Sequence, residues 1–365
     1  MSIIIFILIL ATLVLVHEIG HFTAAKRAGI RVDEFGIGFP PRLFSKKVGE
    51  TVYSINLFPL GGFVKIFGED AGTTPADEKD LERSLVRKSK LTQAWVMVAG
   101  IVFNLVFAWL ILSMGFMIGM PYSVDDSAYG ARVENPVLTI TQVYPKSPAD
   151  TAGLMPGDKI TMLSAGSTQL KDPDIKATQD FILNHSSLSI TYVRGDQTKT
   201  ALVSGTSGIV DARNRAIGVS LDMAGILKLS VPEALYYGGV TTVTLTKDTT
   251  VGLVSFLKNI VLGRANFSEV SGPVGIVGVV QGASALGFIH LISLVALISI
   301  NLAVINFLPF PALDGGRIFF LLIEAIKRSP IKTEVANLVN SIGFLLLILL
   351  MIFVTYHDVL KLIHH

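Results

Sequence analysis

The sequence predicts a polytopic α-helical membrane protein with about four transmembrane helices, a membrane-reentrant β-hairpin and one inserted α/β domain. Hydrophobic residues make up 51% of the chain and charged residues only 16%, whereas soluble domains carry about 25% charged residues. Four segments are apolar over the roughly 20 residues that a helix needs to cross a bilayer. Between the second and third of these segments, short runs alternate polar and apolar residues, as strands do.

Composition also excludes several classes of function. The formal net charge of +2 is too small to indicate a nucleic-acid partner, because phosphate-binding domains carry a clear excess of Lys and Arg. The chain has no cysteine, which excludes disulfides, thiolate catalysis and Cys-based metal sites. Any metal must therefore be bound by His, Asp or Glu.

The four predicted spans are residues 3–25, 94–120, about 291–308 and 335–356. The first lacks a basic n-region and an Ala-x-Ala site, so we expect a retained span rather than a signal peptide. The loops after the first and third spans are rich in cations, and the positive-inside rule makes both cytoplasmic. These cations are Lys26, Arg27, Arg31, Arg42, Lys46, Lys47, Lys65, Arg83, Arg87, Lys88 and Lys90 in one loop and Lys327, Arg328 and Lys332 in the other. The segment 121–290 and both termini should then lie on the other side.

The first span carries His17, Glu18 and His21 near its end. Positions i and i+4 share one face of a helix, so both imidazoles can bind a single ion, with Glu18 beside them as a base. The alternative is that the three residues are paired within the helix bundle. Ionisable groups at membrane depth cost about 2.5 to 3.5 kcal/mol for the worst types, which favours a function. A catalytic zinc needs three protein ligands and an open position, so one ligand is missing.

Asp314 is the candidate for the third ligand. Pro309 and Pro311 break the helix before it, and Gly315 and Gly316 relax the chain after it. A broken helix at membrane depth is tolerated chiefly where protein or a watery cavity covers it. Taken alone, Asp314 could be an ordinary helix cap followed by a basic loop. The incomplete ligand set favours the metal.

Several motifs together resemble the bacterial site-2 proteases, the intramembrane zinc metalloprotease family that includes the regulator-of-sigma-E protease. They are His-Glu-Ile-Gly-His at 17–21, Phe-Gly-Ile-Gly-Phe at 35–39, Pro-Leu-Gly-Gly-Phe-Val-Lys at 59–65, Ser-Gly-Pro-Val-Gly-Ile at 271–276, Asn-x-x-x-x-Asn-x-x-Pro from 301 and Leu-Asp-Gly at 313–315. The resemblance implies that His17, His21 and Asp314 bind Zn²⁺ and that Glu18 is the catalytic glutamate. The family's Ala-Gly-Pro reads Ala99-Gly100-Ile101 here.

Residues 141–163 contain Ser-Pro-Ala, Ala-Gly-Leu and Gly-Asp-Lys-Ile, which resemble the bacterial PDZ signature. With alternation at 188–193 and 217–221, they predict one extracytoplasmic PDZ-like α/β domain at 126–222, where some relatives carry two. Such a domain captures a peptide tail at a sheet edge, unless it is only a spacer. The chain is thus divided into an N-terminal membrane region (1–125), this domain, a connecting segment (223–290) and a C-terminal membrane region (291–365).

The segment 53–67 is too short and interrupted to span the membrane as a helix, yet apolar. We predict a hairpin that dips into the membrane with Gly61 and Gly62 at its turn; a surface hairpin is the alternative. By the resemblance, this element could pair with an unwound substrate. Asn301 and Asn306 could orient a substrate carbonyl or hydrogen-bond between helices.

Ser230-Val231-Pro232-Glu233 has a capping-box pattern and predicts the start of a helix, whose mixed faces suggest that it lies on the outer membrane surface. The remaining histidines have no second ligand at useful spacing. The pair His364 and His365 would be consistent with a tag remnant.

The sequence therefore predicts an intramembrane zinc endopeptidase that performs regulated intramembrane proteolysis. Its expected substrates are single-span membrane proteins, such as anti-sigma factors, or remnant signal peptides. We expect a multi-pass protein of the bacterial cytoplasmic (inner) membrane, with the active site toward the cytoplasmic side. A non-catalytic membrane adaptor that uses its PDZ domain is the alternative, but it would have no use for Glu18. A transporter is disfavoured because the sequence has no internal repeat.

Overall fold

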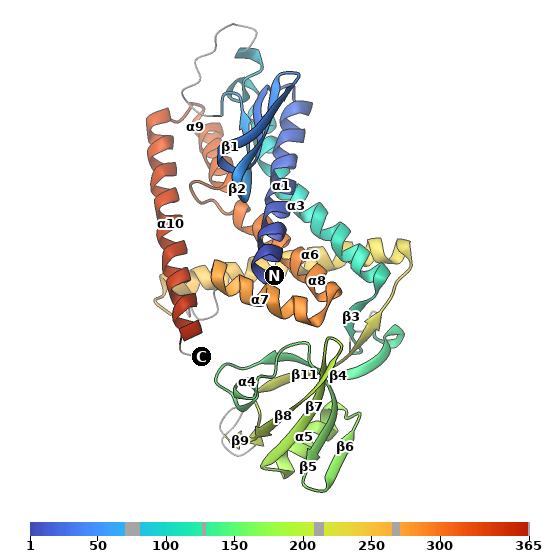
Figure 1. Ribbon diagram of the computed structural model, residues 1–365. Coiled ribbons are helices and arrows are strands. Elements are labelled where there is room, and N and C mark those ends of the chain that lie inside the picture. The colour runs from blue at the N-terminus through green and yellow to red at the C-terminus, as the bar shows by residue number, and fades with distance from the viewer. Residues whose placement is uncertain (70–80, 126–128, 208–214, 265–270, 364–365) are drawn as a thin grey trace. The chain divides into compact units, whose positions relative to one another are not determined.

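A computed structural model describes the chain apart from residues 70–80, 126–128, 208–214, 265–270 and 364–365 (Figure 1). His364 and His365 lie outside the described residues. The chain forms two compact units. The first comprises Met1–Leu112, Leu235–Gln281 and Ile292–His365, and the second Ser113–Ala234 and Gly282–Leu291.

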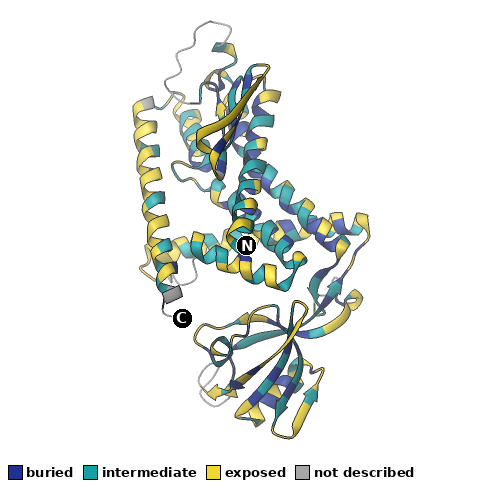
Figure 2. Ribbon diagram, in the orientation of Figure 1, coloured by how far each residue is buried: buried dark blue, intermediate teal, exposed yellow. Residues whose placement is uncertain are grey.

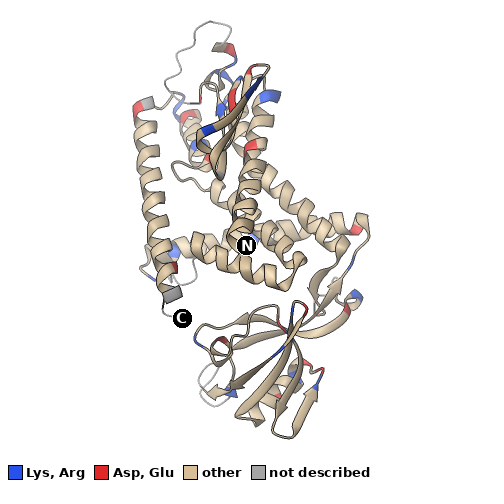
Figure 3. Cartoon of the chain, in the orientation of Figure 1, with Lys and Arg blue, Asp and Glu red and all other residues tan. Residues whose placement is uncertain are grey.

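Four helices among the described residues are long and apolar enough to cross a membrane. They are α1 (Ser2–Arg27), α3 (Lys90–Ile118), α8 (Phe288–Phe307) and α10 (Thr333–Ile363). Few residues along these helices carry the colours of Lys, Arg, Asp or Glu in Figure 3. The four predicted apolar helices are thus confirmed to within a few residues, and the chain is a multi-pass membrane protein.

Two further helices follow the second unit along the chain. Helix α6 (Val231–Val261) begins where the capping box predicted, because the Glu233 carboxylate accepts hydrogen bonds from the Ser230 backbone N–H (3.1 Å) and hydroxyl (2.6 Å). It does not belong to the four candidate spans, and its position on the membrane surface stays a prediction. Helix α7 (Pro273–Leu286) is apolar but short.

The first unit also contains a sheet of two long antiparallel strands, β1 (Val32–Val48) and β2 (Thr51–Ile66). Phe35 pairs with both Tyr53 and Val64, so the first half of β1 lies between the two halves of β2. A short 3₁₀ helix, η1 (Leu85–Arg87), precedes α3. This sheet contacts α1 and places one end of β2 beside the histidines of that helix.

The chain reverses twice in this sheet. The first reversal lies between β1 and β2 at Gly49, whose φ of 62° is in the left-handed region. The second lies within β2, between Ile55 and Gly62, because residues 52–55 run in the same direction as residues 34–37 and residues 62–65 run against them. Gly61 and Gly62 therefore lie next to a reversal, as expected, and its entry into the membrane stays a prediction. Both glycines also permit close packing. A Cβ on Gly61 would lie 2.8 Å from the Phe39 ring, and one on Gly62 would lie 3.0 Å from the Gly36 carbonyl oxygen.

The second unit is an α/β module with a mainly antiparallel sheet of order β3-β11-β4-β5-β7-β8, to which β6 adds beside β5. Its strands are β3 (Met120–Ser123), β4 (Glu134–Val143), β5 (Lys159–Ala165), β6 (Thr168–Lys171), β7 (Ser187–Arg194), β8 (Gln197–Ser204) and β11 (Val219–Leu227). Helices α4 (Pro148–Thr151) and α5 (Ile175–Asn184), the 3₁₀ helix η2 (Gly130–Arg132) and the short pair β9 (Thr206–Ser207) and β10 (Arg215–Ala216) complete it.

The core of this module is formed by buried residues of β4, β5 and β7, of which Ile140, Ile160, Leu163 and Ile190 are fully buried. In β7 the buried residues Leu188, Ile190 and Tyr192 alternate, as the sequence at 188–193 indicated. The sheet extends beyond the expected bounds of 126–222. Strand β3 precedes them, and residue 222 falls inside β11, because the end of β11 pairs with β3. The expected boundary at 290 likewise falls inside α8.

Candidate metal centre

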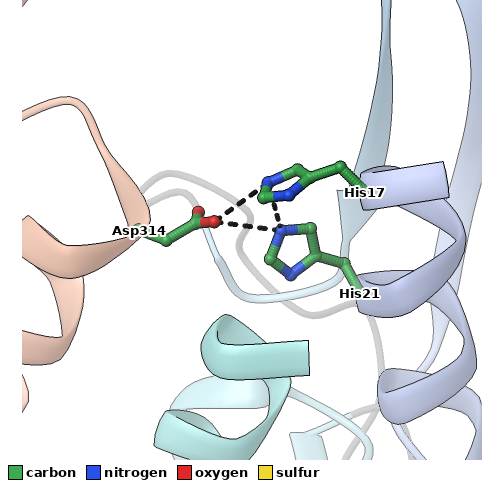
Figure 4. A group of neighbouring side chains, drawn as sticks. All are labelled: His17, His21 and Asp314. Carbon is green, nitrogen blue, oxygen red and sulfur yellow. Dashed lines mark hydrogen bonds and ion pairs between the residues drawn. The ribbon is translucent and has the colours of Figure 1, made fainter. Parts of the chain in front are cut away.

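His17 and His21 project from one face of α1, one helical turn apart (Figure 4). Both are buried, and their Nε2 atoms lie 3.1 Å from each other. Because the two residues are four positions apart in a helix, their side chains lie on the same face, as the sequence predicted. Their exposed fractions are 9% and 7%, so both rings are largely shielded from solvent.

Asp314 reaches the same point from another part of the chain. Helix α8 ends at Phe307, the two prolines follow, and Asp314 is the first residue of α9 (Asp314–Lys327). Its Oδ2 atom lies 3.0 Å from His17 Nε2 and 3.2 Å from His21 Nε2. Three ligand atoms from residues nearly 300 positions apart in the sequence therefore form a small triangle.

This triangle fits a tetrahedral metal ion. Two ligands at about 2.05 Å from a tetrahedral zinc lie about 3.3 Å apart, close to the observed 3.0, 3.1 and 3.2 Å. Asp314 Oδ2 is also buried without a hydrogen-bond partner among the described residues, although both imidazoles are near. A cation is the partner that such an arrangement of lone pairs requires. Elsewhere in the described chain, no other group of three His, Asp or Glu residues converges in this way.

Helix α3 contacts both histidine rings and orients them. His21 Nδ1 lies 2.8 Å from the Val96 carbonyl oxygen, to which an Nδ1–H can donate. That hydrogen bond leaves Nε2 free for a metal. Gly100 of α3 lies against both rings: a Cβ there would lie 2.8 Å from His17 Cε1 and would also collide with His21 Nε2. At Ile101, where the family has proline, α3 continues unbroken and the side chain is buried.

Glu18 lines the same pocket, next to the histidines and to β2. The Val64 backbone N–H donates a hydrogen bond to its carboxylate, and a Cβ on Gly62 would lie 3.4 Å from Glu18 Cγ. The pocket has a volume of about 430 Å³ and is also lined by residues 63–66, residues 312–314 and an ion pair between Glu69 and Arg317. A carboxylate thus lies beside the triangle, with room for a substrate chain.

The loop before Asp314 is held by α10. The Asn340 side-chain oxygen accepts a hydrogen bond from the Ala312 N–H (3.3 Å), and Ala312 has a φ of 73°. A Cβ on Gly343 would lie 2.7 Å from the Pro311 carbonyl oxygen. Most of α10 is exposed, as Figure 2 shows, so a helix long and apolar enough to cross a membrane contacts the loop next to the candidate ligand.

Gly315 and Gly316 serve a different purpose from the one expected. Both are buried in the first turn of α9, and a Cβ on either would collide with backbone carbonyl groups of residues 307–310. They therefore allow α9 to pack tightly against the end of α8, rather than relaxing the chain. The position of Asp314 depends on this close approach.

The other candidate residues are less central. Asn301 and Asn306 lie on α8, are half-buried, and do not line the pocket. Gly61 packs against Phe39, and Gly62 lies against Glu18. The sequence interpretation assigned no role to Glu69 and Arg317, and it did not select Asn104, which is fully buried behind His17.

A signal for one of these residues was nevertheless present. An amide in an otherwise apolar span is costly and often functional, which could have indicated Asn104. The ion pair between Glu69 and Arg317 had no such signal, because the two residues are nearly 250 positions apart and only the fold brings them together.

Comparison with known proteins agrees with this site. Residues 5–350 match the sequence model of peptidase family M50. A Clostridium perfringens protein described as a candidate zinc metalloprotease is 36% identical, covering 99% of each chain. The zinc metalloprotease RasP of Bacillus licheniformis is 31% identical and the regulator of sigma-W protease RasP of Bacillus subtilis 30%, each covering 99% of both chains. The chain belongs to peptidase family M50 and is a membrane zinc metalloprotease.

Proposed function

We propose that the chain is an intramembrane endopeptidase in which His17, His21 and Asp314 hold the zinc ion and Glu18 is the general base. The observation that carries this proposal is the convergence of three ligand atoms within 3.0 to 3.2 Å of one another beside a carboxylate. A zinc site with three protein ligands keeps one position open for reactants, as catalysis requires.

The chemistry divides between the ion and the chain. Zinc supplies Lewis acidity, which polarises the scissile carbonyl and makes water easier to deprotonate at neutral pH. The Glu18 carboxylate accepts the proton of the attacking water and delivers it to the nitrogen of the leaving amine. The hydrogen bond from the Val64 N–H holds that carboxylate at the pocket. A non-catalytic adaptor would have no use for a carboxylate in this position.

The substrate segment is proposed to bind as an extended strand beside β2. Amides within a helix are already hydrogen-bonded, so a transmembrane substrate must unwind before cleavage. Residues 63–66 of β2 line the pocket and offer backbone groups for strand addition. Gly62, which has no side chain, lets this end of the segment lie close to Glu18, because a Cβ there would lie 3.4 Å from Glu18 Cγ.

The end of the β1–β2 sheet that lies away from the pocket supports the proposal that the sheet dips into the membrane. Five large apolar side chains there are exposed by 47 to 63%, which water would disfavour and lipid would accept. They are Phe39, Leu43, Phe44, Leu57 and Phe58. We therefore propose that this end enters the bilayer, where it meets unwound substrates.

The proposed substrates are single-span membrane proteins, such as anti-sigma factors, or remnant signal peptides. One relative is named a regulator of sigma-W protease, which agrees with a regulatory substrate in regulated intramembrane proteolysis. The cation-rich loops favour a site toward the cytoplasmic side of the bacterial cytoplasmic membrane, with the α/β module outside.

The α/β module is proposed to be PDZ-like and to select substrates. A groove of about 420 Å³ runs between α5 and residues 215–221 and is lined largely by apolar side chains. Such a groove suits a peptide tail added beside a strand. A folded substrate domain would collide with the module, whereas a trimmed substrate would pass and leave a short tail to dock.

The experiment compares wild-type protein and Glu18→Gln in liposomes with candidate single-span substrates, with and without a zinc chelator. Glu18→Gln should keep stoichiometric zinc and lose cleavage, because an amide cannot accept the proton of water. His17→Ala, His21→Ala and Asp314→Ala should each lose zinc. Normal cleavage by Glu18→Gln would overturn the assignment of the base.

A further inference from the structure

Asn104 is a fully buried amide in the apolar helix α3. Its backbone carbonyl accepts a hydrogen bond from the Ser299 hydroxyl of α8 (2.8 Å). Its side chain faces α1, with Nδ2 3.5 Å from His17 Nδ1. Its Oδ1 atom is buried and has no hydrogen-bond partner among the described residues. A buried amide oxygen without a donor is costly, so the side chain needs an explanation.

The chemistry of His17 supplies one. His17 Nε2 points at Asp314 Oδ2 and His21 Nε2, so Nε2 is the atom available to a metal. A neutral imidazole that binds through Nε2 carries its proton on Nδ1. An Nδ1–H cannot accept a hydrogen bond from the Asn104 NH₂ group, but it can donate one to an amide oxygen. The oxygen and nitrogen of an amide have nearly the same shape, and a rotation of 180° exchanges them.

We propose that Asn104 is a positioning residue for the zinc site, whose side-chain oxygen accepts a hydrogen bond from His17 Nδ1–H. Helix α3 then orients both histidines, through the Val96 carbonyl for His21 and through the Asn104 amide for His17. Each contact fixes the tautomer and the ring plane and makes the imidazole a better ligand. This inference rests on the proposed ligand set, because it needs His17 to bind through Nε2.

A purely structural role predicts a different pattern of mutations. If Asn104 served only to pack α3 against α8, its backbone carbonyl would matter and its side-chain acceptor would not. A buried carboxylate at this position would then be worse than an apolar side chain of similar size. If Asn104 accepts from His17, Asn104→Asp retains the acceptor and forms the carboxylate–histidine pair that often supports metal-bound histidines.

The test measures the zinc dissociation constant of full-length protein by chelator competition, with thermal unfolding of the zinc-free form measured in parallel. Asn104→Leu and Asn104→Ala should bind zinc about 10- to 100-fold more weakly, whereas Asn104→Asp should stay close to wild type. Ser299→Ala is the matched control, because it removes the hydroxyl at the Asn104 backbone and leaves the amide; its zinc affinity should not change. Because both Asn104→Leu and Asn104→Ala lack the side-chain acceptor, either variant alone suffices for the test if the other fails to fold.

The outcomes separate this inference from the proposal beneath it. Wild-type zinc affinity in His17→Ala would overturn the ligand set. Loss of zinc in His17→Ala together with wild-type affinity in Asn104→Leu or Asn104→Ala would overturn only the role of Asn104. Equal weakening in Asn104→Asp and Asn104→Leu would also overturn it, because the acceptor would then be irrelevant.

Discussion

Gly100→Ala should disable the zinc site without weakening the helix that carries it. The new Cβ would lie 2.8 Å from His17 Cε1 and would also collide with His21 Nε2. Carbon atoms prefer separations of about 3.5 to 4.0 Å, so the His17 ring must move by about 1 Å. Metal–ligand distances tolerate about 0.2 Å. We therefore expect zinc affinity to fall by at least about 100-fold, or about 2.8 kcal/mol.

Two glycines provide matched controls for this substitution. A Cβ on Gly252 or Gly278 would have no neighbour within 4 Å, and alanine favours a helix over glycine by about 1 kcal/mol at all three positions. Gly252→Ala and Gly278→Ala should therefore bind zinc normally. The assay is zinc content after dialysis against graded chelator, with thermal unfolding of the zinc-free forms. The reasoning is refuted if Gly100→Ala folds and binds zinc as tightly as wild type.

Three further predictions follow from the rest of the chain. The sequence has no cysteine, so a single introduced cysteine reports on its own position. Asp196→Cys, at an exposed position, should react with an impermeant thiol reagent added outside cells, and Lys47→Cys, also at an exposed position, should not. Labelling of Lys47→Cys from outside would contradict the predicted topology. Deleting the sheet module 120–227 with a Gly/Ser bridge should leave zinc bound and permit cleavage of untrimmed substrates, and loss of all cleavage by a folded, zinc-loaded protein would exclude the filter. A hydrogen bond from Arg83 lowers the Glu50 pKa to about 2, so Glu50 stabilises the fold above about pH 4.5, and this contribution is lost as the pH falls toward 2. Glu50→Gln should therefore unfold at a lower temperature than wild type at pH 7 and differ less from it at pH 2. Identical pH profiles of the unfolding temperature in the two proteins would contradict this.

The spans and the two-histidine half-site were predictable because they depend on local pattern. A helix of about 20 apolar residues is specified by hydropathy alone, and positions 17 and 21 share a face in any helix. Asp314 required one step more. Its prediction combined two observations, namely that the zinc site lacked a third ligand and that the helix before Asp314 is broken. In the structure, Asp314 lies within 3.2 Å of both histidines.

The reversal of the chain close to Gly61 and Gly62 was predictable from the sequence, whereas the pairing of the strands was not. A glycine in a sequence signals either a left-handed backbone or a close contact, and the sequence does not distinguish the two. Gly49 takes the first role, with a φ of 62°, whereas Gly61 and Gly62 take the second. The apolar character of the segment was recognised, but the local sequence does not specify its pairing with two parts of β1, residues 32–37 and 42–47.

The support of the histidines was hidden for a similar reason. Gly100 and Asn104 acquire their roles only when α3 packs behind α1, and nothing local in α3 specifies that contact. Asn340 and Gly343 of α10 likewise meet the loop before Asp314 only in the folded chain. The sequence indicated which atoms could bind a metal, and the packing shows what holds them.

Zinc-edge X-ray absorption spectroscopy tests the proposed ligand set most directly. The zinc-loaded Glu18→Gln protein, which should be inactive and stable, should show two imidazole nitrogens at about 2.0 to 2.1 Å and carboxylate oxygen at about 2.0 to 2.2 Å. When His17→Ala is loaded at a high zinc concentration, the imidazole scattering should fall to that of one ring. A spectrum without imidazole scattering, or one that His17→Ala leaves unchanged, would contradict the proposed site.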